Sequence, residues 1–144
     1  MISEAMPQMQ SADAADSVPY SILIVDDDRV QVESLAFRLR KQGFTTIHAF
    51  DGKRGLAIAR EQKPDLVLLD LILPDVDGFE VCEALVDAPE TSEIPIIVVT
   101  GSDRPDIVRT SRAAGCEYFV RKPFDPNVLL TLIQHAINRT DWAE

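Results

Sequence analysis

Short apolar runs alternate with helical patterns from residue 21 to residue 139. Three of the runs are continuous and rich in branched aliphatic residues, at 22–25, 66–69 and 96–99. Continuous apolar runs are typical of strands that are covered on both faces, as in the middle of a parallel sheet. Two shorter or more mixed runs, at 45–49 and 117–120, suit strands at the edges of that sheet.

Between these runs, apolar residues repeat at the spacing of one helix face. Gly43 and Gly115 stand where helix C-caps are expected, and Pro105 suits a first helical turn. The predicted helices cover residues 29–42, 52–62, 78–87, 104–114 and 125–139. This (βα)5 alternation predicts an α/β fold, a doubly wound parallel sheet with right-handed crossovers and helices on both faces.

The length of 144 residues fits one domain at 21–139, with a flexible N-terminal tail at 1–20 and a short C-terminal tail at 140–144. The formal charge of −10 disfavours nucleic acid or an anionic membrane as the main partner. Cys82 and Cys116 lack metal-type spacing and do not indicate a disulfide scaffold, which favours a reduced cytoplasm.

Polar residues stand where the predicted strands end. Asp26 and Asp27 follow the first strand, Asp70 follows the third and Thr100 follows the fourth, while Lys122 lies just beyond the fifth. The carboxyl ends of parallel strands lie along one edge, where open α/β folds bind ligands. Three carboxylates, one hydroxyl and one ammonium are therefore expected to converge.

Three close carboxylates repel one another, and Lys122 offsets only one of them. A hard divalent cation with oxygen ligands, above all Mg²⁺, resolves this conflict and keeps Asp70 ionised. An ionised carboxylate beside a cation, a lysine and a hydroxyl is equipped to attack phosphorus and form an aspartyl phosphate.

In combination, these fragments resemble the CheY-like receiver domain of bacterial response regulators, over about residues 21–139. The matching residues are Asp26-Asp27, Asp70 with Pro74 and Gly78, Thr100, and Lys122-Pro123-Phe124. Each fragment alone is a weak signal, whereas the ordered set at suitable spacing is a strong one. The resemblance implies a flavodoxin-like fold with strand order 2-1-3-4-5.

The resemblance also implies a role for each residue at the strand ends. Asp70 is the phosphoacceptor, and Lys122 pairs with the phosphoryl group through a segment whose Lys122–Pro123 bond is cis. Mg²⁺ is held by Asp27 and Asp70, by Asp26 largely through water, and by the backbone carbonyl of Ile72.

A conformational switch is implied as well. Thr100 moves to the phosphoryl oxygen, and Phe119, where many relatives carry Tyr, turns inward behind it. Phe119 fills the vacated space but has no hydroxyl to anchor its outward state. The mobile partner surface comprises residues 104–114, 117–120 and 125–139.

The implied phosphoryl donor is a sensor histidine kinase or a histidine phosphotransfer protein. The domain is expected to assist its own phosphorylation and slow dephosphorylation without being an enzyme. Its downstream target is a protein that the sequence does not identify, and a phosphorylation-dependent dimer is left open. On length alone, a stand-alone receiver is preferred over a piece of a longer regulator.

Two other functions compete with this hypothesis. A haloacid-dehalogenase-type phosphohydrolase also forms an aspartyl phosphate but places a second Asp two residues later, where this chain has Ile72. Apolar Ile72 orients water poorly, so slow loss of the phosphoryl group is expected. A constitutive binding module ranks third, because the acids, Thr100 and Lys122 are all present.

Simpler roles compete at individual positions. Thr100 is an ordinary turn residue in one alternative, and Asp28 is expected to cap the helix that follows it. Asp75 and Asp77 precede Gly78 in a pattern that suggests a calcium loop, but Leu73 and Ala84 would then occupy ligand positions. These two acids are therefore expected to solvate their loop.

Overall fold

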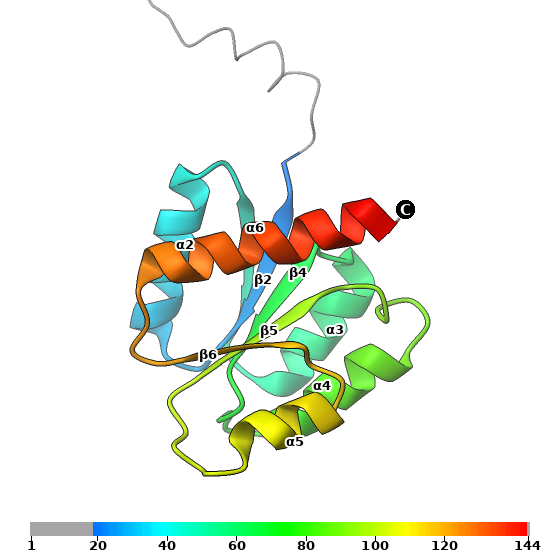
Figure 1. The fold of residues 1–144 in the computed structure, drawn as a ribbon. Helices are drawn as coiled ribbons and strands as arrows, with labels where there is room; N and C mark the ends of the chain where they lie inside the picture. Colours follow the sequence, from blue (N-terminus) through cyan, green and yellow to red (C-terminus); the bar gives the residue numbers. More distant parts are fainter. Residues whose placement is uncertain (1–18, 144) are drawn as a thin grey trace, which may run out of the picture.

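The computed structural model describes residues 19–143, so nearly all of the predicted N-terminal tail lies outside the described residues (Figure 1). Strands and helices alternate along the described part, as the hydrophobic pattern predicts. The elements in chain order are β2 (Ser21–Val25), α2 (Arg29–Lys41), β3 (Thr45–Ala49), α3 (Gly52–Gln62), β4 (Leu66–Leu69), α4 (Gly78–Asp87), β5 (Ile96–Thr100), α5 (Ile107–Ala113), β6 (Tyr118–Arg121) and α6 (Pro126–Ala143).

The described strands form one parallel sheet in the order β3-β2-β4-β5-β6. Numbered along the chain, this is the predicted order 2-1-3-4-5 of a flavodoxin-like fold. The two mixed runs, β3 and β6, are the edge strands, as predicted. Val25 lies beside Ala49 on one side and Leu69 on the other, so neighbouring strands end level with one another.

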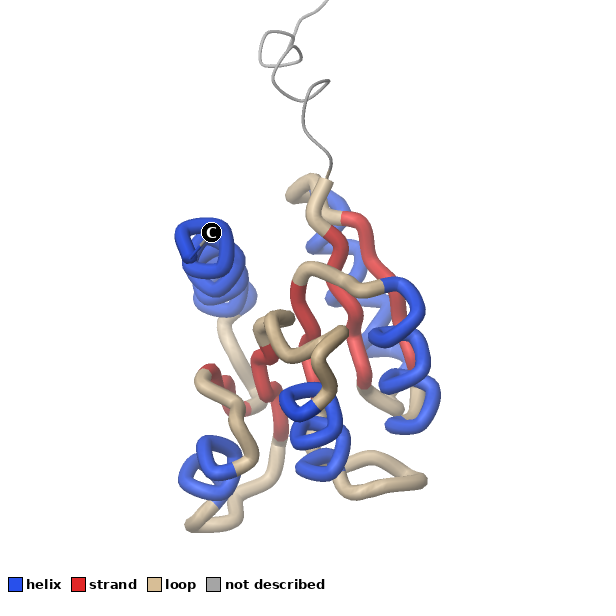
Figure 2. Tube along the Cα trace, turned by 90° about the vertical axis from the view of Figure 1, so that its right-hand side faces the viewer, coloured by secondary structure: helices blue, strands red, loops and turns tan. Residues whose placement is uncertain are grey.

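Side chains of the central strands alternate between two separate cores, and Figure 2 shows the strands between helices. One core packs against α2 and α6 and includes Ile22, Ile24, Leu66, Leu68, Ile97 and Val99. The other packs against α3, α4 and α5 and includes Leu23, Val25, Val67, Leu69, Ile96 and Val98. Burial on both faces explains why these strands read as continuous apolar runs.

The predicted start of the fourth helix, at 104, is wrong. α5 begins at Ile107, and Pro105 precedes the helix. The Ser102 hydroxyl accepts a 3.3 Å hydrogen bond from the backbone N–H of Arg104. Local bonds of this kind between a side chain and the backbone compete with helix formation. At the other end of the chain, α6 continues to Ala143, past the predicted end at 139.

The two cysteines, expected to be unpaired, form a disulfide between Cys82 of α4 and Cys116, which precedes β6. Their Cα atoms are 6.9 Å apart, and both residues are buried in the core on the α4 side of the sheet. The pairing has no local signature, because 34 positions separate the two residues and only the packing of α4 brings them together.

We expect alkylation of the denatured protein to modify neither cysteine unless a reductant is added, and both after reduction. Reduction should also lower the free energy of unfolding, by about 2–4 kcal/mol, because the bond constrains the unfolded chain. Intact mass and urea unfolding with and without reductant measure both effects. Alkylation without reductant would contradict the pairing.

Within residues 19–143, no helix combines the length and the apolar character needed to cross a membrane.

Candidate functional site

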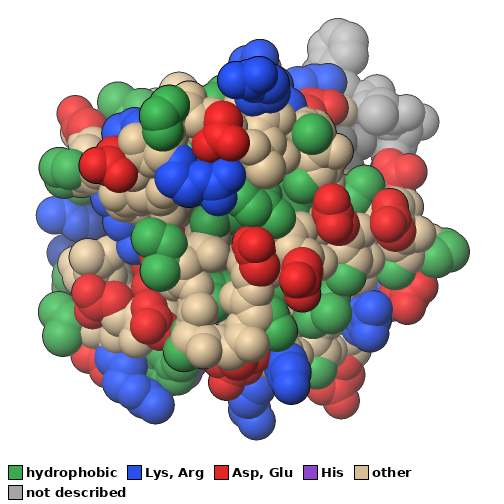
Figure 3. All heavy atoms as spheres, turned by 90° about the horizontal axis from the view of Figure 1, so that it is seen from below, with side chains coloured by type: hydrophobic (Ala, Val, Ile, Leu, Met, Phe, Trp, Pro, Cys, Tyr) green, Lys and Arg blue, Asp and Glu red, His purple; other side chains and the backbone are tan. Residues whose placement is uncertain are grey.

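The candidate site lies at the carboxyl ends of β2, β4 and β5, at the bottom of Figure 1. The hydrogen bonding between neighbouring strands continues one residue past the ends of β2 and β4. The Asp26 N–H donates to the Ala49 carbonyl at 3.1 Å, and the Asp70 N–H donates to the Val25 carbonyl at 2.9 Å. Asp26 and Asp70 are consequently fixed side by side, and both are buried. Figure 3 views this edge and shows acidic side chains across its middle.

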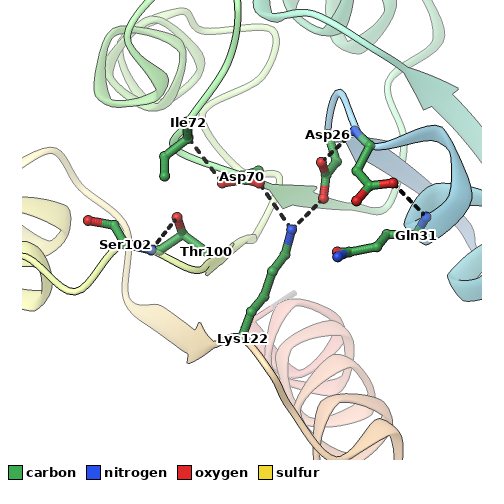
Figure 4. Close-up of polar contacts among 8 residues, drawn as sticks. Asp26, Gln31, Asp70, Ile72, Thr100, Ser102 and Lys122 are labelled. Atoms are coloured by element: carbon green, nitrogen blue, oxygen red, sulfur yellow. Dashed lines mark hydrogen bonds and ion pairs between the residues drawn. The ribbon is translucent and has the colours of Figure 1, made fainter.

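Lys122 lies between the two carboxylates (Figure 4). Its Nζ donates to Asp26 Oδ2 at 2.7 Å and to Asp70 Oδ2 at 3.0 Å. The backbone N–H of Lys122 donates to the Thr100 carbonyl at 2.9 Å, which holds the segment after β6 against the end of β5. The peptide bond from Lys122 to Pro123 is cis, as expected.

The second oxygen of each carboxylate is also anchored. The N–H of Asp28 donates to Asp26 Oδ1 at 3.0 Å, and the N–H of Ile72 donates to Asp70 Oδ1 at 3.0 Å. Each acid therefore accepts one bond from the backbone and one from Lys122. These bonds fix the orientation of both carboxylates and satisfy buried polar atoms.

Burial raises the pKa of Asp26, and the hydrogen bonds from Lys122 and from the Asp28 N–H offset only part of that effect. Burial by itself would lower the pKa of Lys122, but its bonds to Asp26 and Asp70 outweigh burial and raise it. Two buried carboxylates beside one ammonium carry a net charge of −1, which favours the approach of a further cation.

The raised pKa of Asp26 gives a prediction for stability. Folded Asp26 retains its proton at pH values where the unfolded residue, with its ordinary pKa of 3.8, has lost it. The stability that protonated Asp26 contributes is therefore fully present below pH 3.8. It declines as the pH rises through the raised pKa of the folded residue. Relative to wild type, Asp26→Asn should gain stability over that acidic range, as urea unfolding at a series of pH values would show. A constant difference between the two proteins would contradict the shift.

Among the described residues, the side chains of Thr100, Phe119 and Asp27 form no hydrogen bond or ion pair with Asp26, Asp70 or Lys122. Thr100 is fully buried and is the last residue of β5, and its Oγ1 accepts a 3.3 Å hydrogen bond from the N–H of Ser102 (Figure 4). Phe119 is half-buried in β6, with the Arg121 guanidinium 5.6 Å from its ring centroid. Asp27 is exposed.

Three acids near the site act as helix caps. Asp28 Oδ1 accepts from the Gln31 N–H at 3.2 Å at the start of α2, as predicted. Asp75 and Asp77 are exposed, as expected for acids that solvate their loop, but each also binds a helix N-terminus. Asp77 accepts from the Phe79 N–H at 2.9 Å and caps α4, while Asp75 binds the N-terminus of α3. No sequence signal points to Asp75, because its partners lie more than 20 positions away.

The donors at this edge fit a hard divalent cation. Asp26 and Asp70 supply carboxylate oxygens, Ile72 follows with a backbone carbonyl, and the local charge is negative. Among residues 19–143, no three His, Cys, Asp or Glu side chains form a group that could hold a metal ion, so the expected convergence of Asp27 with Asp26 and Asp70 is not observed.

A groove of about 710 Å³ opens beside the triad. It runs between α2 and the segment that follows Lys122, and Asp26, Asp70 and Lys122 lie in its wall. Its apolar lining includes Val30, Leu35, Pro123, Phe124 and Pro126.

Comparisons with known proteins identify the family of this chain. The family model described as response regulator receiver domain matches residues 22–134. Protein PilH of Pseudomonas aeruginosa is 38% identical over 112 residues, which cover 78% of this chain and 93% of PilH. The DNA-binding dual master transcriptional regulator RpaA of Synechocystis is 35% identical over 120 residues, 83% of this chain. The chain spans only 50% of the length of RpaA.

Solved structures show the same fold. The CheY-like response regulator receiver domain protein of Methanospirillum hungatei superposes with a TM-score of 0.84 at 28% identity. The match covers 88% of this chain and all of that one. The family match, the PilH relationship and this superposition agree, so the chain belongs to the response regulator receiver domain family of two-component signalling proteins.

Proposed function

We propose that Asp70 accepts a phosphoryl group from a phosphohistidine of a sensor kinase or phosphotransfer protein, in a reaction that requires Mg²⁺. The observation that carries this proposal is the contact of one partly buried ammonium, Lys122 Nζ, with both Asp26 and Asp70. A phosphoacceptor needs an ionised carboxylate and a fixed positive charge for the incoming oxygens. The triad supplies both.

In the transfer, a carboxylate oxygen of Asp70 attacks phosphorus as the bond from phosphorus to the donor imidazole breaks, and the imidazole nitrogen keeps the electron pair. The Ile72 N–H holds Asp70 Oδ1 at 3.0 Å, which fixes the direction of the carboxylate. Lys122 moves its positive charge from the carboxylate oxygens to the phosphoryl oxygens. Asp27, Asp70, the Ile72 backbone carbonyl and, largely through water, Asp26 would hold Mg²⁺, which would supply further charge neutralisation.

Phosphorylation then switches the face formed by α5, β6 and α6. Thr100 Oγ1 gives up its bond from the Ser102 N–H and donates its own hydrogen to a phosphoryl oxygen. Phe119 turns into the space behind Thr100, and the outer surface of β6 changes shape. The output is a protein contact at this face, with a dimer of phosphorylated domains as a second form of that contact.

The groove beside the triad is the proposed approach for the donor, since its apolar lining suits a protein surface and its wall includes Asp70.

The domain works in the cytoplasm and does not itself bind nucleic acid. RpaA is described as DNA-binding, but this chain spans half of RpaA, so the two properties are compatible. Alkylation in freshly lysed cells reports whether the Cys82–Cys116 bond persists in the cytoplasm, where disulfides are rare.

Incubation with acetyl phosphate tests the proposed chemistry without a cognate kinase. With Mg²⁺ present, intact mass should rise by one phosphoryl group, and chelation of the metal should abolish the gain. A gain that is unaffected by chelation would remove Mg²⁺ from the proposal, and no gain at all would remove phosphorylation.

The phosphoryl group should be lost slowly. The side chain of Ile72, two residues after the phosphoacceptor, is 59% exposed and carries no group that orients water for attack. The half-life of the aspartyl phosphate, followed by intact mass after the donor is removed, measures this. Hydrolysis within a second or so would favour a phosphohydrolase.

A further inference from the structure

The first turn of α3 is capped from two directions. Helix N-termini leave N–H groups without partners inside the helix. Asp51, the preceding residue, accepts from the Arg54 N–H at 2.8 Å. Asp75 accepts from the Gly52 N–H at 2.8 Å through one oxygen and from the Lys53 N–H at 2.9 Å through the other. The turn thus depends on a carboxylate from the loop between β4 and α4.

The same loop presses against α3 beside this contact. Gly52 is buried, and a Cβ atom at this position would lie 2.3 Å from Val76 Cγ2 and 3.3 Å from Leu73 Cδ1. Only a glycine admits the loop at this distance. Polar and steric contacts therefore join residues 73–76 to the same helical turn.

The loop tied down in this way is the one that follows the phosphoacceptor. It runs from Asp70 to the α4 cap, Asp77, and its near part is held by the Ile72 N–H bond to Asp70. The Gly78 N–H donates to the Leu71 carbonyl at 3.1 Å and closes the loop. The contact of Asp75 with α3 fixes the outer part of the loop, and Asp77 forms a β-bridge with Ile72.

We propose that Asp75 is a positioning residue for the phosphorylation site: by binding the N-terminus of α3, it holds the loop that carries the Ile72 carbonyl, which would be a ligand of the cation. This inference rests on the proposed function and adds to it a residue that touches neither the cation nor the phosphoryl group. The N–H bonds from Gly52 and Lys53 also lower the pKa of Asp75, which keeps the carboxylate ionised and the contact intact near neutral pH.

Asp75→Ala and Asp77→Ala form a matched pair, because both remove one negative charge from the same loop and both remove a helix cap. Asp77 caps α4 and does not bind α3. We expect Asp75→Ala to weaken Mg²⁺ binding about tenfold, the lower end of the range for residues that orient metal ligands. Asp77→Ala should lose comparable stability in urea unfolding but keep the wild-type Mg²⁺ affinity. Asp75→Asn, which retains one acceptor oxygen, should weaken binding by less than Asp75→Ala.

Titration with Mg²⁺ alone, followed by amide NMR shifts, measures the affinities without any phosphorylation. Equal loss of affinity in the two alanine variants, or none in Asp75→Ala, would overturn the positioning role while leaving the proposed function intact. If Asp75→Ala does not fold, an unchanged affinity in Asp75→Asn overturns the role equally well. Failure of the wild type itself to bind Mg²⁺ would contradict both proposals.

Discussion

Lys122→Ala should reduce the rate of phosphorylation by acetyl phosphate about 100-fold or more, the usual cost of removing one donor that stabilises developing negative charge. The variant leaves the incoming phosphoryl oxygens without their ammonium. It also leaves two buried carboxylates 2.7 and 3.0 Å from where the Nζ atom stood. Initial rates of mass gain at saturating Mg²⁺ measure the effect.

Lys41→Ala is the control for this experiment. Lys41 is an exposed residue at the end of α2, so its removal changes the net charge equally but leaves the triad intact. Its rate should match that of the wild type. Lys122→Arg should recover only part of the rate, since a planar guanidinium does not reproduce the contacts of a compact ammonium. A wild-type rate in Lys122→Ala would show that the lysine is not part of the reaction.

Gly78→Ala should lower the free energy of unfolding by about 3 kcal/mol, near the upper end for inserting a methyl group into a packed site. The added Cβ would lie 2.4 Å from Leu71 Cα and 2.7 Å from the Leu71 carbonyl oxygen. Both are backbone atoms, so the clash is relieved only by moving the phosphoacceptor loop. Urea unfolding measures the loss.

Gly101→Ala provides the comparison for Gly78→Ala. The nearest atom to a Cβ at Gly101 is Lys122 Cβ, at 3.9 Å, so the methyl group has room. Its stability should stay within about 0.5 kcal/mol of wild type, as for most exposed substitutions. Similar losses in both variants would indicate that general effects of replacing glycine, and not the approach of Leu71, determine the result.

The strands follow from features that the sequence carries locally, whereas their order was implied by the resemblance to receiver domains. Runs such as 66–69 are continuous because both faces of the sheet are covered, and the mixed composition of 45–49 and 117–120 matches two edges. Most helix starts were also predictable, because apolar residues repeat at the spacing of one helix face. The start of α5 was not, because a local bond from the Arg104 N–H to the Ser102 hydroxyl competes with helix formation before Ile107.

The convergence of Asp26, Asp70 and Lys122 was predictable because the topology of a parallel sheet brings strand ends to one edge. The contact of Asp75 with α3 and the bond between Cys82 and Cys116 were not. Both contacts join residues that are far apart in the chain. No motif or characteristic spacing in the sequence identifies the partner of either residue. Such pairings emerge only once the helices have packed.

The identity of the phosphoacceptor tests the central claim most directly. Asp70→Asn and Asp77→Asn remove one acid each from the same loop, and acetyl phosphate with Mg²⁺ is offered to both variants and to the wild type. We predict that intact mass rises by one phosphoryl group in the wild type and in Asp77→Asn, and does not rise in Asp70→Asn. A phosphoryl gain in Asp70→Asn equal to that of the wild type would contradict the assignment of Asp70 and the mechanism built on it.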